Sequence, residues 1–590
     1  MPEPNTHTQT RPRPIAWLIM IAMGLMVYAN SFSGPFIFDD HTAILENSAI
    51  ETLWPPTWLT KAWAPEKGAH GRPIVNFTLA LNYAIGGFNV WGYHLINIAI
   101  HILNALILFT ILRHTFQGPC LYAKYGNLAQ NLSLTIALFW LIHPLQTQCV
   151  NYILQRSESI MALFYLLTLY GTIRTCQNPS HYFWPITTII FCALGMASKE
   201  VMATAPLVVL LYDKTFLSAT WRKTLVNKWP FYLGLATTWL VLVSLLLQRP
   251  HGDTIGFATH FSAWDYLKNQ LPTLTLYLKR VIWPDPLILD YGFPIPNLPL
   301  VQVLPQAVVL IVLFGGTLYA LKHHTALGFL GACFFIILAP TSSVIPIINE
   351  VGAERRMYLP LISCIVLITL SVYEAFQYFY PAKTTRTIWT LRTLVIIPIA
   401  VLSSLTLLRN HDFRSEVAIW ETVTTHLPQN PRAWNILGHI QNQNNDFEAA
   451  IPYFKKSLQQ DPNFIYAHYN LGHALTELNR PDEAIEHFTQ AVTRDLDEKR
   501  LEDWLPRIHN NLGSAYLRLG QYQKAIPHFQ KTLTLQPQHF LAQNNMGVAY
   551  LQAGHYQKAI EQFQTTLRLN PDYAGAKSNL QLAKDLSQAQ

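Results

Sequence analysis

The chain has 590 residues, of which 51% are hydrophobic and only 13% are charged, whereas soluble domains carry roughly 25% charged residues. The net charge of +7 is modest and no dense Lys/Arg cluster is present, which argues against a nucleic-acid partner. Six cysteines without CxxC spacing favour small buried hydrophobes over disulfides or metal ligands. Long apolar runs stop near Arg409, so we expect an all-α chain, with a polytopic membrane domain over 1–410 and a soluble domain over 411–590.

The apolar runs of the first part predict about eleven membrane spans. They lie near residues 15–32, 94–113, 130–147, 157–174, 182–197, 200–213, 229–249, 301–321, 325–347, 357–379 and 388–408. Arg11 and Arg13 precede the first run, and the positive-inside rule therefore places the N-terminus in the cytoplasm. The stretch 266–282 carries three cations and is predicted to be an interfacial helix rather than a crossing.

The second span begins with polar residues that recur at helical spacing. His94, Asn97, His101 and Asn104 share one face of this helix. Polar side chains within a span usually face the interior of the helix bundle. We therefore expect these four residues to be buried.

Two adjacent carboxylates, Asp39 and Asp40, follow the first apolar run. A charge at the bilayer centre costs about 2.5–3.5 kcal/mol, so the pair should lie at the membrane surface on the non-cytoplasmic side. Neighbouring carboxylates raise each other's pKa or attract a cation, which suits a general base or a site for a divalent metal such as Mg²⁺ or Mn²⁺. The alternative is an acidic turn that caps the next helix.

Other polar and charged residues fall in loops expected on the same side as Asp39. They are His143, Arg156, Glu158, Lys199, Glu200, Asp285, Asp290, Glu350, Glu354, Arg355 and Arg356. A transporter would more often place such groups in mid-span, whereas an enzyme acting on lipid head groups would place them at the surface. The alternative is that each group only anchors a helix end at the membrane edge.

The C-terminal part repeats itself from about Pro431. The glycines 438, 472, 513 and 547 are separated by 34, 41 and 34 residues, and an alanine and a phenylalanine in each unit keep the same separations. This period is that of tetratricopeptide repeats, in which small residues let paired helices pack closely. We predict four repeats, a leading helix over 415–426 and a capping helix after Ala574, with an insert around Asp497–Trp504.

A short superhelix of this kind has a concave face that binds an extended peptide or another protein. The alternative is a spacer or an assembly surface for a partner subunit. The predicted topology puts the repeats in the same compartment as Asp39, which favours delivery or positioning of an acceptor protein.

Several motifs along the chain together resemble the transmembrane and tetratricopeptide repeat-containing O-mannosyltransferases. They read FDDHTAILENSAI, GRPIVNFTLALNYAIGGFNVWGYHLINIAIHILNAL, HPLQTQCVNYILQRSESIMALFYLLTLY, ASKEVMATAPLVVLLYD and AERRMYLP, followed by the repeats. The family belongs with the GT-C glycosyltransferases, which include the protein O-mannosyltransferases. The order of the motifs, more than any single one, carries the resemblance.

The resemblance implies an inverting transfer of a hexose such as mannose from a polyprenyl-phosphate donor to a hydroxyl of a protein or peptide. Asp39 matches the first-loop acidic residue and would be the general base, with Asp40 supporting it or helping to hold a metal. The candidates for binding the donor phosphate are Glu354, Arg355, Arg356, Arg72 and Lys199. Further active-site candidates are His143, Arg156 and Glu350. Arg356 is an extra cation beside Arg355, and which of the two meets phosphate is open.

The competing prediction is a membrane-anchored repeat scaffold for an envelope or secretion complex, in which the transferase domain has lost its activity. The acidic pair and the gathered Arg and Glu residues argue against it. For the enzyme we expect the bacterial inner membrane, a cytoplasmic N-terminus and repeats in the periplasm or a lumen.

Overall fold

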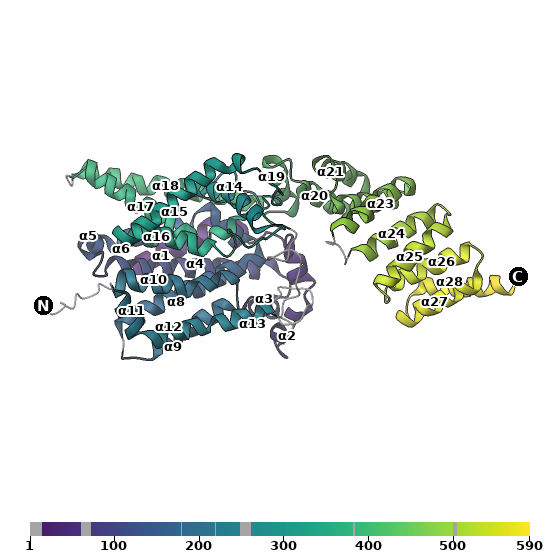
Figure 1. The fold of residues 1–590 in the computed structure, drawn as a ribbon, viewed down its shortest axis with the longest axis horizontal. Helices are drawn as coiled ribbons and strands as arrows, with labels where there is room; N and C mark the ends of the chain where they lie inside the picture. Colours follow the sequence, from purple (N-terminus) through teal and green to yellow (C-terminus); the bar gives the residue numbers. More distant parts are fainter. Residues whose placement is uncertain are drawn as a thin grey trace. The chain divides into compact units, whose positions relative to one another are not determined.

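The computed structural model describes residues 14–60, 72–178, 180–218, 220–247, 261–381, 384–498 and 504–589. Within these ranges the regular elements are helices, and no β-strand is present. The chain divides into two compact units, Met1–Ile419 and Trp420–Gln590. The predicted all-α class is therefore confirmed (Figure 1).

The first unit contains most of the helices, and the boundary between the units falls within the last of them. They are α1 (Pro14–Val27), α2 (Thr57–Thr60), α3 (Pro73–Gly86), α4 (Val90–Phe116), α5 (Tyr122–Tyr125), α6 (Ala129–Leu141), α7 (Thr147–Asn151), α8 (Arg156–Gln177), α9 (Phe183–Met196), α10 (Ala205–Tyr212), α11 (Trp221–Asn227), α12 (Trp229–Thr237), α13 (Trp239–Leu247), α14 (Ala263–Ile282), α15 (Leu300–His323), α16 (Thr325–Leu338), α17 (Pro360–Phe379), α18 (Thr385–Asp412) and α19 (Glu416–His426). Large apolar side chains stay exposed along α13, α15 and α18, as expected of helices that face lipid.

Helix α4 lies at the centre of this unit and packs on α1, α6 and α8. Its predicted polar face is buried: His94, Asn97, His101 and Asn104 are each at most 1% exposed. The Nδ1 atom of His101 lies 2.7 Å from the Tyr358 hydroxyl, and the Asn104 amide donates to the same hydroxyl at 3.1 Å. The prediction that these side chains face the bundle interior is confirmed.

Fewer helices than predicted meet the requirements of a membrane span. By length and composition seven segments of the described residues qualify: Pro14–Ser31, Val90–Phe116, Ile153–Gln177, Trp229–Leu247, Leu300–His323, Pro360–Phe379 and Trp389–Asp412. An eighth is the pair Tyr122–Leu141 and Pro144–Asn151, which is bent by 55°.

The predicted number of eleven spans is thus too high by this measure. Helices α9 and α16 are apolar but have only 14 residues each. The run predicted at 200–213 is a 3₁₀ turn, Glu200–Thr204, followed by the short α10. Helix α14, predicted to be interfacial, is not among the candidate spans.

The second unit is a stack of helix pairs. The pairs are α20 (Pro431–Gln443) with α21 (Phe447–Gln460), α22 (Ile465–Glu477) with α23 (Pro481–Glu498), α24 (Leu505–Arg518) with α25 (Tyr522–Leu535), and α26 (Phe540–Gln552) with α27 (Tyr556–Leu569), followed by α28 (Ala574–Gln588). In each pair the repeating phenylalanine ring lies against the repeating glycine, so that a Cβ on Gly472 would lie 2.8 Å from the Phe488 ring. The predicted four repeats, leading helix and capping helix are present.

The predicted insert around Asp497–Trp504 lies largely outside the described residues. Its first part lengthens α23, which has 18 residues where α21 has 14. Arg11 and Arg13 also lie outside the described residues.

Candidate functional site

The loop after α1 holds the two predicted catalytic carboxylates in different environments. Asp39 is exposed, and its backbone N–H donates to the Tyr152 hydroxyl at 3.1 Å. Asp40 is fully buried, and its two oxygens accept hydrogen bonds from the backbone N–H groups of Leu154 (2.8 Å) and Ile37 (3.1 Å). Asp39 is therefore the carboxylate that faces outward, while Asp40 joins its loop to the turn at Leu154.

Burial raises the pKa of Asp40 to about 7, against the two hydrogen bonds from backbone N–H groups, which lower it. The carboxylate of Asp39 adds a further small increase. Near neutral pH, Asp40 is consequently divided between its protonated and ionised forms. Its place in the fold suits a residue that positions Asp39.

Tyr152 is hydrogen-bonded to the acidic loop and lies within electrostatic reach of Arg355. Burial raises the pKa of its phenol well above the usual range, and the Asp39 and Asp40 carboxylates act in the same direction. The opposing influence comes from Arg355, which is close enough to Tyr152 to act on its charge. Asp39 and Arg355 therefore both lie near the same tyrosine.

The two neighbouring arginines have different partners. Arg355 forms a bidentate ion pair with the Glu350 carboxylate, and its Nη1–Oε1 distance is 2.9 Å. Arg356 donates to the backbone carbonyls of Glu350 (2.9 Å) and Val351 (3.2 Å), and its side chain is only 4% exposed, against 18% for Arg355. Arg355 is thus the more accessible cation, and Arg356 holds the 350–351 loop.

Glu354 points into the protein, away from the acidic loop. Its Oε1 accepts hydrogen bonds from the Ile288 N–H at 2.6 Å and from the Tyr291 hydroxyl at 3.0 Å. Its Oε2 lies 3.7 Å from Arg409 of α18. Glu354 is fully buried and joins the 288–291 loop to α18, which is a structural role in this geometry.

Two further cations, Lys199 and Arg72, form ion pairs with glutamates. The ammonium of Lys199 forms a 2.8 Å ion pair with Glu158, and Arg72 lies 3.8 Å from Glu200. Burial lowers the pKa of Lys199, with the Glu158 carboxylate opposing this shift. The positive charges of Arg72 and Arg355 add to the lowering. Two predicted donor-phosphate residues, Arg72 and Arg355, therefore both act electrostatically on a third, Lys199.

The guanidinium of Arg156 has several structural partners. It donates to Asn97 (2.6 Å), to Asn82 (2.6 Å) and to the carbonyls of Tyr93 (2.8 Å) and Thr78 (3.2 Å). Arg156 is fully buried and joins α8 to α3 and α4. Its donors are already engaged, which leaves little capacity for a ligand.

His143 also has a structural position. Its Nδ1 accepts from the Leu145 N–H at 3.2 Å, and its Nε2 lies 3.1 Å from the Val281 carbonyl. An Nδ1 that accepts leaves Nε2 as the donor, so the ring is the neutral Nε2–H tautomer in this arrangement. His143 is only 2% exposed and connects the bend after α6 to the end of α14.

The metal site that the acidic pair suggested finds little support in the geometry. Within the residues that the structure describes, no group of three or more His, Cys, Asp or Glu side chains could hold a metal ion. Both oxygens of Asp40 already accept from backbone N–H groups. A metal at Asp39 and Asp40 therefore stays a prediction, and none of the proposed steps depends on it.

Two residues of this region do not stand out in the sequence. Tyr152 accepts a hydrogen bond from the acidic loop and lies within electrostatic reach of Arg355, and Gln148 accepts the Arg355 backbone N–H at 2.8 Å. Both lie inside the motif HPLQTQCVNYILQRSES. Their place in this motif was the sequence signal that could have identified them. They were missed because uncharged residues suggest a role in catalysis or binding less directly than cations do.

Known proteins with similar sequences point to one family. A family model described as dolichyl-phosphate-mannose-protein mannosyltransferase matches residues 69–247, and tetratricopeptide repeat models match 404–463, 441–502 and 504–572. Protein O-mannosyl-transferase TMTC4 of Mus musculus is 24% identical over 499 residues, which cover 75% of this chain and 66% of the relative. The predicted resemblance is confirmed.

Other relatives have the same kind of name. Mouse TMTC3 is 22% identical over 79% of this chain and 53% of its own length. Mouse TMTC2 is 30% identical over 34% of this chain and 24% of its own length. The chain spans less than two thirds of the length of each of these relatives. Among solved structures, that of MamA is 28% identical, with a TM-score of 0.23, and covers 25% of this chain and 83% of that chain.

Four candidate residues fall within the mannosyltransferase match, namely Arg72, His143, Arg156 and Lys199. Asp39 and Arg355 lie outside it. Their assignment depends on the wider resemblance and on the geometry around Tyr152.

Proposed function

We propose that this chain is a membrane glycosyltransferase of GT-C type that transfers mannose or another hexose from a polyprenyl-phosphate donor to a hydroxyl of a protein. The observation that carries the proposal is that Asp39 and Arg355 both lie near Tyr152. It supports a site in which an exposed carboxylate and a cation act on the same substrate. A transfer from a lipid phosphate to an alcohol needs both.

In this mechanism Asp39 accepts the proton of the acceptor hydroxyl while the hydroxyl oxygen attacks the anomeric carbon of the sugar. The bond between that carbon and the phosphate oxygen breaks, with inversion at the carbon. The phosphate leaves with the lipid, and its growing negative charge is stabilised by Arg355 and Lys199. Asp40 and Tyr152 position the loop that carries Asp39.

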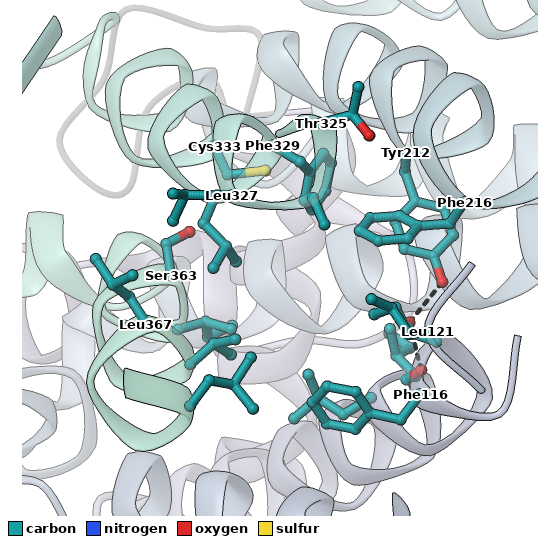
Figure 2. Close-up of a pocket in the computed structure, with 18 of the residues that line it drawn as sticks. Phe116, Leu121, Tyr212, Phe216, Thr325, Leu327, Phe329, Cys333, Ser363 and Leu367 are labelled. Atoms are coloured by element: carbon teal, nitrogen blue, oxygen red, sulfur yellow. Dashed lines mark hydrogen bonds between the residues drawn. The ribbon is translucent and has the colours of Figure 1, made fainter. Parts of the chain in front are cut away.

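A cavity of about 870 Å³ in the first unit supports a lipid donor. Its lining is mainly apolar, and Figure 2 shows side chains of α16 and α17, such as Phe329, Cys333 and Leu367, surrounding it together with Tyr212 and Phe116. Polyprenyl chains are apolar and flexible, so such a lining suits them.

One end of the cavity lining lies close in the chain to Arg355. Leu359, which follows Arg355 by four residues, contributes to its lining, and so does Glu374 near the far end of α17. From Leu359 to Glu374 a helix rises about 22 Å, so the lining extends along most of α17. A polyprenyl tail in this cavity would therefore be able to leave its phosphate close to Arg355.

Transfer can be tested directly with purified protein, polyprenyl-phosphate sugars and mass spectrometry of added peptides and co-purifying proteins. We expect hexose transfer by the wild type and its loss in Asp39→Asn, with the fold intact. Glu51→Gln, which alters another exposed carboxylate, is the matched control and should retain transfer. Unchanged transfer by Asp39→Asn would reject Asp39 as the base, and no transfer by the wild type with every donor would favour the scaffold.

We infer further that the protein lies in a bacterial inner membrane, with a cytoplasmic N-terminus and with the site and the repeats on the opposite side. The repeat unit contains no cysteine, so a cysteine introduced there reports its side of the membrane in a variant whose six native cysteines are replaced. We expect a membrane-impermeant maleimide to label it from the periplasm in intact cells. If the cysteine is labelled only after the inner membrane is opened, the repeats lie in the cytoplasm and the inferred topology is wrong.

A further inference from the structure

Two pairs of histidines lie face to face within the repeat unit. Between α22 and α23, Nδ1 of His468 lies 3.1 Å from Nδ1 of His487. Between α24 and α25, Nδ1 of His509 lies 3.1 Å from Nδ1 of His528. Each pair joins the first helix of a repeat to its second helix, and we call them the His468 pair and the His509 pair.

The two pairs occupy the same place in successive repeats. The partners are 19 positions apart in both pairs, and the second pair follows the first by 41 positions, the separation of these repeats. In the fourth repeat this place holds Gln543, whose amide donates to Gln562, and in the first it holds the stacked rings of Trp434 and Tyr453. Amide and aromatic pairs therefore also satisfy the packing here, so packing alone does not require histidine.

A backbone carbonyl fixes the tautomer of His468. Its Nε2 lies 3.1 Å from the carbonyl oxygen of Pro462, which can only accept, so Nε2 carries the hydrogen. In the neutral ring Nδ1 then has the lone pair, and this atom faces Nδ1 of His487. Histidines that ligate metals usually have this arrangement, with one ring N–H held by a carbonyl and the other nitrogen left for the ion.

The separation of the nitrogens matches that of two ligands on one ion. Imidazole nitrogens bind Zn²⁺ at about 2.0–2.1 Å, so two of them in a tetrahedral or square-planar arrangement lie about 2.9–3.4 Å apart. Both pairs, at 3.1 Å, lie within this range. A rotation of each ring about its Cβ–Cγ bond turns both lone pairs toward an ion beside the line that joins them. The same distance also fits an N–H···N hydrogen bond, which is the alternative to be tested.

The exposure of the rings and their chemistry define the ion. His468 and His509 are only 7% and 8% exposed, whereas His487 and His528 are partly exposed and leave each pair open on one side. Among the described residues no third His, Cys, Asp or Glu completes either pair, so water would supply the remaining ligands. Imidazole suits Zn²⁺, Cu²⁺ and Ni²⁺, whereas Mg²⁺ and Ca²⁺ prefer oxygen ligands.

We propose that the His468 pair and the His509 pair each bind one divalent transition-metal ion, such as Zn²⁺ or Cu²⁺, through two imidazole nitrogens. Each ion would link the first and second helices of its repeat and stabilise the middle of the solenoid. This inference goes beyond the proposed transfer reaction and does not depend on it. It also concerns a different kind of site from the one that the acidic pair suggested, because the histidine pairs contain no carboxylate.

The test uses the full-length protein in lipid nanodiscs, purified through a tag that contains no histidine and stripped of metal with a chelator. Isothermal titration calorimetry gives the number of Zn²⁺ ions bound per chain. EPR spectroscopy of bound Cu²⁺ distinguishes two equatorial nitrogen ligands from one or none. Mg²⁺ is the control ion and should not bind to the pairs.

The fourth repeat supplies the design of the matched variants. His468→Gln with His487→Gln copies its glutamine pair, which keeps a hydrogen bond between the helices but removes both imidazoles. We expect this double variant to bind one Zn²⁺ fewer per chain than the wild type and to lose the corresponding Cu²⁺ signal. His509→Gln with His528→Gln should remove one further ion. His555→Gln, which alters an exposed histidine of the same unit, should bind metal as the wild type does.

The reverse exchange tests whether the place itself is sufficient. Gln543→His with Gln562→His introduces the pair into the fourth repeat, and we expect this variant to bind one Zn²⁺ more than the wild type. A folded variant with unchanged stoichiometry would count against the proposal. This measurement leaves both native pairs in place.

Equal Zn²⁺ stoichiometry in the wild type and in a variant with all four histidines replaced would overturn the proposal, and the pairs would then be hydrogen bonds only. If that variant does not fold, the wild type alone decides. Saturating Zn²⁺ should raise the Tm of the repeats by about 5 °C, and Mg²⁺ should leave it unchanged. No such rise, together with a Cu²⁺ spectrum that shows fewer than two nitrogens, would reject the proposal. Because these measurements report metal binding, a failure of sugar transfer would not affect them.

Discussion

The carboxylate of Glu416, the first residue of α19, accepts a hydrogen bond from the backbone N–H of Phe38 at 3.0 Å. Its other oxygen lies 3.4 Å from Nε2 of His41. Phe38 has a φ of 48°, in the left-handed region that non-glycine residues rarely adopt. One glutamate at the end of the membrane part thus contacts the acidic loop on both sides of Asp39.

Removal of this carboxylate should impair the reaction without touching Asp39. We expect Glu416→Ala to lower the rate of transfer by about tenfold, because the strained backbone at Phe38 loses a charge-assisted hydrogen bond. Glu421→Ala, an exposed residue on the same helix, is the control and should transfer normally. The transfer assay checks this, and an unchanged rate would mean that the loop keeps its conformation without Glu416.

Arg355 and Arg356 should differ in what they contribute. Arg355→Lys keeps the charge but loses the bidentate geometry, so we expect a higher KM for the lipid donor and a transfer rate lower by about tenfold. Arg356→Lys loses contacts to two backbone carbonyls and should mainly lower the thermal stability. Donor titrations and thermal unfolding of both variants separate these outcomes, and the reverse pattern would exchange the two roles.

The buried Asp40 should make the stability depend on pH. Burial raises its folded pKa to about 7, above the ordinary value of 3.8, so between these values the folded state binds the proton more tightly. The contribution of Asp40 to the free energy of unfolding is therefore greatest below about pH 3.8 and is lost as the pH rises to about 7.

Asp40→Asn removes this titration, and we expect a shallower fall of Tm with rising pH in that window. Its Tm at low pH should also be reduced, because an amide oxygen accepts readily from only one of the two N–H donors. A hydrogen bond with Glu416 raises the pKa of His41 in the folded protein above its ordinary value of 6.5. The titration of His41 therefore also lowers Tm as the pH rises above 6.5. A slope equal to that of the wild type would show that Asp40 does not titrate in this range.

The glycine–phenylalanine contacts of the repeats can be tested by a double-mutant cycle. A Cβ on Gly513 would lie 2.8 Å from the ring of Phe529, so Gly513→Ala should destabilise the repeat unit by about 1–3 kcal/mol. In a Phe529→Leu background the ring is absent, and the same change should cost about 1 kcal/mol less. Both values are measured by chemical denaturation, monitored through the unfolding of the repeats. If the two changes in unfolding free energy are strictly additive, the strain at Gly513 does not come from its contact with Phe529.

The repeat unit was readable from sequence because its decisive contacts are local and periodic. Gly472 meets Phe488 only 16 positions later, and the same pair recurs in each repeat. The site was harder to predict because partners come from distant segments: Arg156 bonds Asn82 across 74 positions, and Glu354 bonds Tyr291 across 63. From the sequence alone, a charged residue that binds a ligand cannot be distinguished from one that only holds the fold together.

The predicted number of spans exceeds the number of helices that meet the length criterion, and the reason is a different one. Apolar composition predicts that a segment can leave water, but it does not say how long the helix is. The stretch 200–213 is apolar enough, yet its first part forms a 3₁₀ turn and the helix that follows has eight residues. The residue before this turn, Lys199, forms a 2.8 Å ion pair with Glu158, a distant contact that hydropathy does not contain.

The four bonds of the Arg156 guanidinium also bear on how the protein is made. Its partners lie on α3 and on α4, so the charge is compensated only when these helices and α8 are together. A variant in which α3 or α4 does not pack on α8 would leave this guanidinium buried with only part of its hydrogen bonds, which is costly. The three helices should therefore fold together and not one by one.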